Sequence, residues 1–173
     1  MSRKERGSVW LGVAGIVINE KGEWLVVQKR YGGLNGKWSL PAGFVEGTET
    51  VDQAVLREIK EETGIDAEVI QLIGFRSGVI KEKVSDNMAI IFLRPFDSTQ
   101  TPDPQLDELY EAKWMTPEQL LADERTTSMI KVFLKVNQQA GFEKREGLDP
   151  GPVFGYSSYK LFTASEHEDV TKS

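Results

Sequence analysis

The stretch from residue 43 to residue 65 constrains the fold most, because it predicts one helix whose two ends are both marked in the sequence. Thr50 is followed three residues later by Gln53, the spacing of a capping box, and Gly64 stands where a C-terminal glycine cap belongs. The helix is therefore expected to run from about Val51 to Thr63. Segments rich in Val, Ile and aromatic residues precede and follow it, so it has strands to pack against.

Two glutamates fall on the apolar side of this helix. On a wheel that advances about 100° per residue, Glu58 and Glu62 lie within the apolar arc, Glu61 at its border and Arg57 just beyond it. The arc itself consists of Val51, Ala54, Val55 and Ile59. Carboxylates four residues apart repel one another, and burial increases the cost. They are tolerated if the arc opens into a wet cleft or a cation binds between them; the alternative is a solvated acidic patch with Arg57 and Lys60 as partners.

The remaining segments predict a mixed sheet with helices packed on it. Strands are expected at 9–18, 24–28, 67–79, 88–96 and 111–115, and further helices after Thr116 and over 127–139. An Asn-Glu-Lys-Gly turn at 19–22 predicts that the first two strands form a hairpin. The length suits one domain over 1–140. An extension over 141–173, with an aromatic segment at 154–162, is expected to pack on the domain or on the second subunit of a homodimer.

The composition narrows the chemistry of any site. There is no cysteine, which excludes thiolate nucleophiles and ligands, and the one histidine, His167, is expected to be an uninvolved surface residue. Oxygen ligands indicate Mg²⁺ or Mn²⁺ rather than Zn²⁺. The net charge of −6 argues against binding a nucleic-acid polymer but not a single nucleotide. Since no apolar run could cross a bilayer and no signal peptide is evident, we expect a cytoplasmic protein without a membrane partner.

The segment from Gly43 to Ile65 resembles the Nudix box, written G-x5-E-x7-R-E-U-x-E-E-x-G-U with U an aliphatic residue. Every specified position is matched at the required spacing, by Gly43, Glu49, Arg57, Glu58, Ile59, Glu61, Glu62, Gly64 and Ile65. Seven of these positions demand a single residue type, so a chance match in one window is on the order of 10⁻⁸. The resemblance extends to the lead-in at 36–43 and the acidic strand at 108–115, and covers about residues 8–140.

This resemblance to the Nudix (MutT-like) hydrolase family implies an α/β/α sandwich around a central mixed β-sheet, with the box forming loop, helix and loop. Carried over position by position, it makes Glu58, Glu61 and Glu62 the core carboxylates. Glu61 and Glu62 would bind a divalent metal. Glu58 would bind metal as well, or take the proton from the attacking water, since family members differ in which residue is the base.

The same resemblance assigns supporting roles. Arg57 and Glu49 would orient the core carboxylates by salt bridges. The backbone carbonyl before Gly43 often completes the metal shell, and here it belongs to Ala42 where many members have glycine. Glu108 matches a position where some members place a further acidic ligand or base, and its alternative is a solvated loop residue.

The implied activity is Mg²⁺- or Mn²⁺-dependent hydrolysis of a phosphoanhydride bond in a nucleoside diphosphate linked to another moiety, a small nucleotide-type substrate. Bound metal would reverse the local negative charge, polarise the phosphoryl oxygens and lower the pKa of an attached water. One alternative is a Nudix-fold module that binds a nucleotide metabolite without hydrolysis. A second, an isomerase of isoprenoid diphosphates, is disfavoured because it resembles enzymes that need a catalytic cysteine.

Residues outside the box leave the substrate open. The proline typical of the ADP-ribose type is replaced within 79–81, and the tyrosine of the dinucleoside-polyphosphate type within 81–83. The NADH and coenzyme A signatures are absent. Two further groups have either a binding role or an ordinary structural one. Lys29, Arg30 and Arg76 could contact phosphate or be surface charges, and Trp10, Tyr31, Trp38 and Phe75 could stack on a base or pack in the core or loops.

Overall fold

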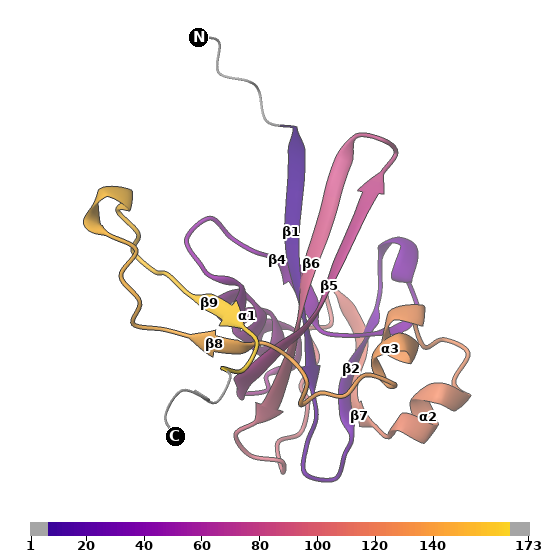
Figure 1. Cartoon of the computed structure of the whole chain (residues 1–173). Helices are drawn as coiled ribbons and strands as arrows, with labels where there is room; N and C mark the ends of the chain where they lie inside the picture. Colours follow the sequence, from indigo (N-terminus) through magenta and orange to yellow (C-terminus); the bar gives the residue numbers. More distant parts are fainter. Residues whose placement is uncertain (1–6, 167–173) are drawn as a thin grey trace.

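Layers of helix and sheet make up residues 7–166, the part of the chain that the computed structural model describes (Figure 1). His167 lies outside these residues, and of Phe154 only the backbone is described. The strands are β1 (Ser8–Val17), β2 (Trp24–Lys29), β3 (Trp38–Ser39), β4 (Ala42–Phe44), β5 (Ala67–Ile80), β6 (Val84–Pro95), β7 (Leu109–Met115), β8 (Glu143–Arg145) and β9 (Leu161–Thr163). The helices are α1 (Val51–Thr63), α2 (Pro117–Ala122) and α3 (Ser128–Phe133), with short 3₁₀ turns η1 (Gly32–Leu34) and η2 (Pro152–Phe154).

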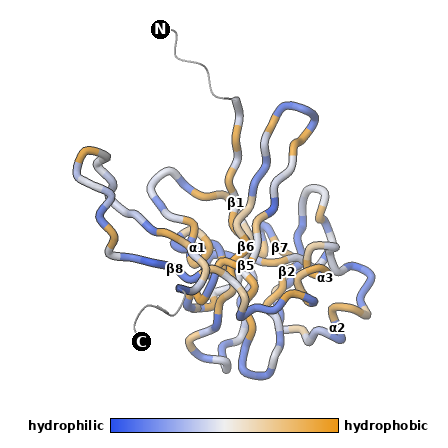
Figure 2. Tube along the Cα trace, viewed as in Figure 1, coloured by the Kyte–Doolittle hydropathy of each residue, from blue (hydrophilic) through white to orange (hydrophobic). Residues whose placement is uncertain are grey.

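The central sheet is mixed, as predicted. Its order is β4-β1-β6-β5, with β1 and β6 parallel and the other two pairs antiparallel. A second, antiparallel sheet has the order β3-β2-β7. One buried cluster joins α1 to one face of the central sheet, and another joins the opposite face to the second sheet and α3. This is the expected α/β/α sandwich, and Figure 2 shows apolar segments converging where these elements meet.

The predicted hairpin of the first two strands is wrong beyond its turn. Only the bridge between Ile18 and Trp24 joins them, after which β1 enters the central sheet and β2 the second sheet. The reason is burial, because Val13–Val17 of β1 and Trp24–Val27 of β2 are all buried. A strand buried on both faces and both edges lies in the middle of a sheet. Each therefore pairs with two other strands rather than with its sequence neighbour.

Both ends of α1 form as predicted. The Thr50 N–H donates to Gln53 Oε1 at 3.0 Å, which is the arm of the capping box that reaches back. At the other end Gly64 adopts φ 72°, and its N–H donates to the Lys60 carbonyl at 2.9 Å. None of the helices among the described residues is both long and apolar enough to span a membrane.

The helix predicted over 127–139 is wrong in length, since α3 ends at Phe133. Beyond it the Val136 N–H bonds to the Phe133 carbonyl, three residues back, and Asn137 Oδ1 accepts the Gln139 N–H at 3.0 Å. Asparagine side chains compete in this way with helical hydrogen bonds. The chain then turns back, so that Phe142 forms a bridge with Leu72 at β5.

Three strands extend past the layers as a projecting ribbon, formed by 8–12 of β1 and by 74–88 of β5 and β6 (Figure 1). β6 begins at Val84, four residues before the predicted start, because the β5–β6 pairing continues to Ile80. The turn at its tip holds Lys81 and Glu82 at positive φ.

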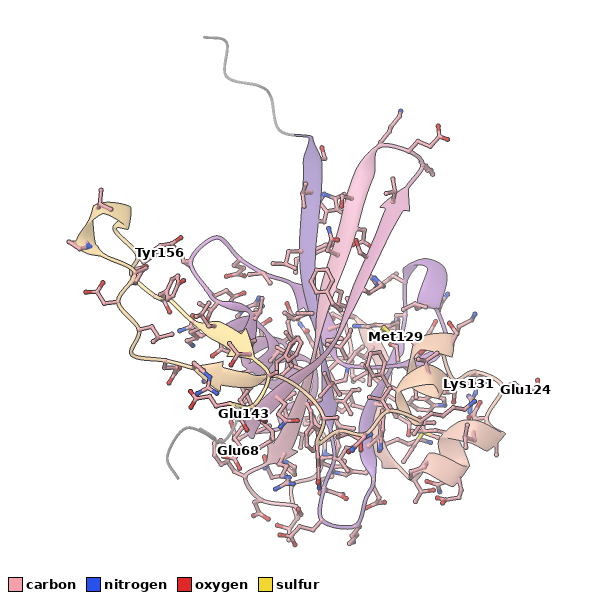
Figure 3. All side chains as sticks on the ribbon, in the orientation of Figure 1. Glu68, Glu124, Met129, Lys131, Glu143 and Tyr156 are labelled. Carbon is pink, nitrogen blue, oxygen red and sulfur yellow. The ribbon has the colours of Figure 1, made fainter. Side chains whose placement is uncertain are left out.

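The extension after residue 140 folds into the β8–β9 hairpin, which contacts β5 and the first turn of α1. In Figure 3, Glu143 lies on β8 beside the body of the molecule and Tyr156 further out along the extension. The rings of Tyr156 and Tyr159 meet edge to face, with centroids 5.1 Å apart. Whether the extension also meets a second subunit stays a prediction.

Candidate active site

An open cleft of about 600 Å³ lies between the C-terminal half of α1, β4 and the turn that precedes β7. The structure brings most of the predicted site residues to this cleft, namely Ala42, Gly43, Arg57, Glu58, Glu61, Glu62 and Glu108. Glu49 completes the set from behind, through its contacts with Arg57. The side chains of Glu58 and Glu62 are 14% and 3% exposed, so these two are not part of a solvated patch.

Glu62 is the most deeply buried acid of the cleft. Its Oε1 accepts a hydrogen bond from Lys29 Nζ at 2.5 Å, and its Oε2 accepts the Ala42 N–H at 3.2 Å. Burial raises the pKa of Glu62 to about 7, and the charge and hydrogen bond of Lys29 offset only part of that effect. The carboxylate therefore depends on a neighbouring cation to stay ionised.

Arg57 holds the other carboxylates in place. It forms a two-pronged pair with Glu49, with Nε–Oε2 and Nη2–Oε1 distances of 3.0 and 2.6 Å. Its Nη1 donates to Glu58 Oε1 at 2.9 Å and to Glu61 Oε2 at 3.2 Å, and its Nη2 donates to the Phe44 carbonyl at 3.0 Å. The hydrogen bonds from Arg57 lower the pKa of Glu49. One guanidinium thus ties α1 to β4 and fixes two carboxylates of the cleft.

The space beside Gly43 is filled by Glu58. A Cβ built on Gly43 would lie 2.1 Å from both Cδ and Oε1 of Glu58, a distance that no structure tolerates. An alanine at this position would therefore force the carboxylate of Glu58, the flexible end of its side chain, to move. Burial raises the pKa of Glu58, and the hydrogen bond and charge of Arg57 offset only part of that rise.

Glu108 stands across the cleft from α1. It is exposed, and its backbone closes a turn in which its N–H donates to the Gln105 carbonyl at 3.1 Å. Its carbonyl accepts the Arg30 N–H at 3.0 Å, which joins this turn to the end of β2. The turn therefore brings an acidic side chain to the rim of the cleft.

The carboxylates are balanced by protein cations. Among residues 7–166, no group of three or more His, Cys, Asp or Glu side chains has an arrangement that could hold a metal ion as it stands. Glu62 is paired with Lys29, while Glu58 and Glu61 share Arg57. In chemistry the donors fit a hard divalent cation, because they are all oxygen and lie at one cleft. Binding such a cation requires these side chains to turn from their present partners.

Lys29 lines the cleft, although the sequence did not distinguish it from an ordinary surface lysine. The pairing of β2 with β7 shifts register between Gln28 and Lys29, and such irregularities re-aim a side chain. No alternation pattern in the sequence marks this shift. The other two cationic candidates do not line this cleft. Arg30 donates to the Leu106 carbonyl, and Arg76 pairs with Asp86 at 2.7 Å.

The four aromatic candidates separate into different roles. Trp38 is a core residue, 1% exposed, and its indole N–H donates to Asp123. Tyr31 is exposed just before η1. Phe75 and Trp10 are both exposed on the projecting ribbon. Only Trp10 lies beside the cleft, in edge-to-face contact with Phe44 at a centroid distance of 5.7 Å.

Comparison with known proteins matches nearly the same part of the chain, about residues 8–140, over which the sequence resembles the family. A family model described as the NUDIX domain matches residues 10–136. Nudix hydrolase 8 of Arabidopsis thaliana is 41% identical over 109 residues, which are 61% of this chain and 29% of that protein. The ADP-ribose pyrophosphatase of Methanocaldococcus jannaschii is 36% identical over 77 residues, 44% of this chain and 46% of that one.

Solved structures show the same fold. The NUDIX domain of Shewanella oneidensis NrtR, crystallised with ADP ribose, superposes with a TM-score of 0.62 at 19% identity, over 74% of this chain and 85% of that one. At this identity the likeness concerns the fold alone. The chain spans between 29% and 56% of the length of four Arabidopsis relatives that it matches.

Proposed function

Because the chain belongs to the Nudix family, whose domain model matches residues 10–136, we propose that it hydrolyses a phosphoanhydride bond in a nucleoside diphosphate linked to another moiety. One observation carries the proposal. Two carboxylates with little exposure, Glu58 and Glu62, face an open cleft and are each held by a cation, Arg57 or Lys29. Burying such groups is costly, and the cost is expected where charge is used in chemistry.

The donor set suits Mg²⁺ or Mn²⁺. Glu58, Glu61, Glu62 and the Ala42 carbonyl would hold the ion, which supplies positive charge to the phosphoryl oxygens and lowers the pKa of a bound water. The family implies these ligands, and the shared cleft supports them. A calorimetric titration of the protein with MgCl₂ alone, repeated on Glu62→Gln, tests this assignment without any substrate. Equal affinity of the two proteins would remove Glu62 from the ligand set.

The protein's own side chains would bind and orient the substrate and move the proton. Arg57 holds Glu58 and Glu61 beside the cleft in the metal-free protein, and both would turn from it to bind the cation. Lys29 stands at the floor of the cleft, where its ammonium group would neutralise phosphate charge once a cation replaces it at Glu62. Either Glu58 or Glu108 would take the proton from the attacking water, since both line the cleft, and the choice between them stays open.

For the substrate we propose a nucleoside diphosphate joined to a sugar, with ADP-ribose as the first candidate. The name of one similar protein supports it, the ADP-ribose pyrophosphatase of Methanocaldococcus jannaschii. The proline that is typical of the ADP-ribose type is replaced in this chain. The residues in its place, 79–81, lie at the tip of the β5–β6 hairpin. The cytoplasmic location and the homodimer remain predictions, to be checked by cell fractionation and by light scattering of the purified protein.

The experiment is a phosphate-release screen with purified protein. It covers ADP-ribose, nucleotide sugars, nucleoside triphosphates, oxidised nucleotides and dinucleoside polyphosphates, each with Mg²⁺, Mn²⁺ or EDTA, and with a coupled phosphatase to reveal hidden products. Turnover of one class in Mg²⁺ or Mn²⁺ but not in EDTA is expected. Silence across the panel, together with ligand-induced thermal stabilisation, would overturn the hydrolase in favour of a binding module.

Replacing Glu62 tests the site itself. Glu62→Gln keeps the size of the side chain but removes its charge, and the metal-dependent rate should fall by about 10²-fold or more. The far-ultraviolet dichroism should not change. Glu68→Gln, an exposed glutamate at the start of β5 that is labelled in Figure 3, is the matched control and should keep full turnover. A Glu62→Gln protein with full turnover in saturating Mg²⁺ would contradict the assignment.

A further inference from the structure

A second hollow of about 250 Å³ adjoins the carboxylate cleft on the projecting ribbon. The two spaces share Lys29, Ala42, Gly43 and Phe44, so one ligand can occupy both. Ligand sites commonly measure about 300–1,000 Å³, a range that the two spaces together reach. The second hollow is therefore placed to hold the part of a substrate that continues beyond its phosphates.

The walls of this hollow are aromatic. Trp10 of β1 and Phe44 of β4 are 44% and 59% exposed, although their rings touch edge to face. Gly12, two residues after Trp10 on β1, lies between Phe44 and Met88 in register, since it pairs with both. A Cβ on Gly12 would come within 3.3 Å of the Met88 Cε, so the glycine keeps the floor open. Exposed rings beside an open floor offer a stacking surface for a planar ligand.

The rim of the hollow is polar. Asp86 lies next to Trp10 in the β1–β6 register, and Oδ2 of Asp86 accepts from Arg76 Nη2 at 2.7 Å. The Asp86 side chain is 21% exposed, so a ligand can reach its carboxylate. A carboxylate accepts hydrogen bonds and donates none. At Asp86 itself this favours a ligand edge that carries an N–H group over one that carries a carbonyl, while Arg76, which lines the same hollow, can donate to an acceptor beside it.

We propose that this hollow binds the nucleobase of the substrate, stacked on Trp10 and Phe44, and that Asp86 selects bases that carry an exocyclic amino group. Adenine and cytosine carry such a group where hypoxanthine and uracil carry a carbonyl oxygen, and guanine carries one at C2, where hypoxanthine has only hydrogen. The inference rests on the proposed function, because it takes the neighbouring cleft as the diphosphate site. Lys29, which lines both spaces, marks the boundary between base and phosphates.

The test measures binding of nucleoside monophosphates by calorimetry in EDTA, so that no turnover is involved. AMP and IMP differ by an amino group against an oxygen, and so do CMP and UMP. We expect AMP and CMP to bind about tenfold more tightly than IMP and UMP, since a hydrogen bond to a charged group has this effect. Trp10→Ala should weaken AMP binding roughly tenfold, the usual effect of losing a stacked ring. Asp86→Asn should abolish the preference within each pair.

Phe75→Ala is the matched control. Phe75 is 61% exposed on the same ribbon and adjoins Arg76 in β5, so its ring points to the opposite face of the sheet. It should leave all four affinities unchanged. The inference is overturned if none of the four binds at millimolar concentration, if Phe75→Ala weakens binding as much as Trp10→Ala, or if Asp86→Asn keeps the preference. Selective binding without turnover in the screen would overturn the proposed function alone, and turnover without these effects would overturn this inference alone.

Discussion

At residue 43 the chain has no side chain, and the carboxylate of Glu58 occupies the space that a Cβ would take. Arg57 holds the same carboxylate from its other side at 2.9 Å. The position of Glu58 is thus fixed by the missing side chain of Gly43 and by the ion pair with Arg57. Both residues lie within the segment that resembles the family motif. Small changes at Gly43 or Arg57 should therefore alter activity more than stability.

Gly43→Ala adds one methyl group where Glu58 now lies. The Glu58 carboxylate must move, and displacement of a reactive group by about 1 Å can cost about 10²-fold in rate. We expect kcat for the substrate found in the screen to fall by about that factor, with a melting temperature within a few degrees of wild type. Gly47→Ala is the control, because a Cβ at Gly47 meets nothing within 4 Å. Equal kcat values for both variants would contradict the close-approach argument.

The buried charge of Glu62 predicts a pH dependence of stability in metal-free protein. Burial raises the folded-state pKa from 4.5 to about 7, so between these values the unfolded chain releases a proton that the folded protein keeps. The contribution of Glu62 to stability is complete below about pH 4.5 and is lost as pH rises through 7. Its full size is at most about 3 kcal/mol.

Urea unfolding in EDTA at pH 5 and pH 8 measures this contribution. Glu62→Gln cannot ionise, so the stability of wild type relative to the variant should fall between the two pH values. Parallel pH profiles for the two proteins would show that Glu62 titrates normally in the folded state.

Among the elements, α1 is held at its N-terminus by the C-terminal extension. The Asp52 side chain, 3% exposed, accepts hydrogen bonds through Oδ2 from Lys160 Nζ at 2.5 Å and from Lys144 Nζ at 3.2 Å. Burial by itself would raise the pKa of Asp52, but the hydrogen bonds and charges of the lysines, together with a bond from the Thr50 hydroxyl, outweigh it and lower the pKa. Helix α1 is thus bonded to residues outside the matched domain.

Lys160→Ala should destabilise the protein by about 1–3 kcal/mol at pH 7, because it removes one cation from a buried carboxylate while Lys144 remains. Since the folded-state pKa of Asp52 is lowered, the stability it provides is present above its ordinary value of 3.8 and is lost as pH falls through the folded pKa. Urea unfolding should therefore show a large difference at pH 7 and a smaller one at pH 3. Lys135→Ala, at an exposed lysine past α3, should change little. A Lys160→Ala effect of equal size at both pH values would exclude the ion pair as its cause.

For the molecule as a whole, the extension lies outside the family match at 10–136 but touches two layers of the fold. The N–H of Phe142 bonds to the Leu72 carbonyl at 2.8 Å, and the Leu72 N–H bonds back at 2.9 Å. Together with the lysines at Asp52, these contacts join the extension to β5 and to α1. We propose that the extension is an integral part of this domain.

Truncation after Ala140 tests that proposal. It removes both lysines from Asp52 and leaves a buried carboxylate without its cations, so the melting temperature should fall by about 5–10 °C. Light scattering of the same two proteins reports the oligomeric state. An unchanged melting temperature with an unchanged oligomeric state would mean that the extension stabilises neither the domain nor a dimer.

The sequence by itself determined helix α1 and the candidate site residues on it. The ends of α1 depend on Thr50, Gln53 and Gly64, which act through hydrogen bonds to residues at most four positions away. The placement of Glu58 and Glu62 on the buried arc follows from helical spacing alone. Such features are local, because a few consecutive residues contain every atom involved.

Only the tertiary structure decided which distant segments meet. It placed β1 and β2 in different sheets, brought Lys29 to Glu62, and set Trp10 beside Phe44. These contacts join residues 33 or 34 positions apart and depend on how strands buried on both faces share a core. Burial is non-directional, so many pairings satisfy the same apolar pattern. The chosen one is fixed by register and packing across the whole domain, which no short stretch of sequence contains.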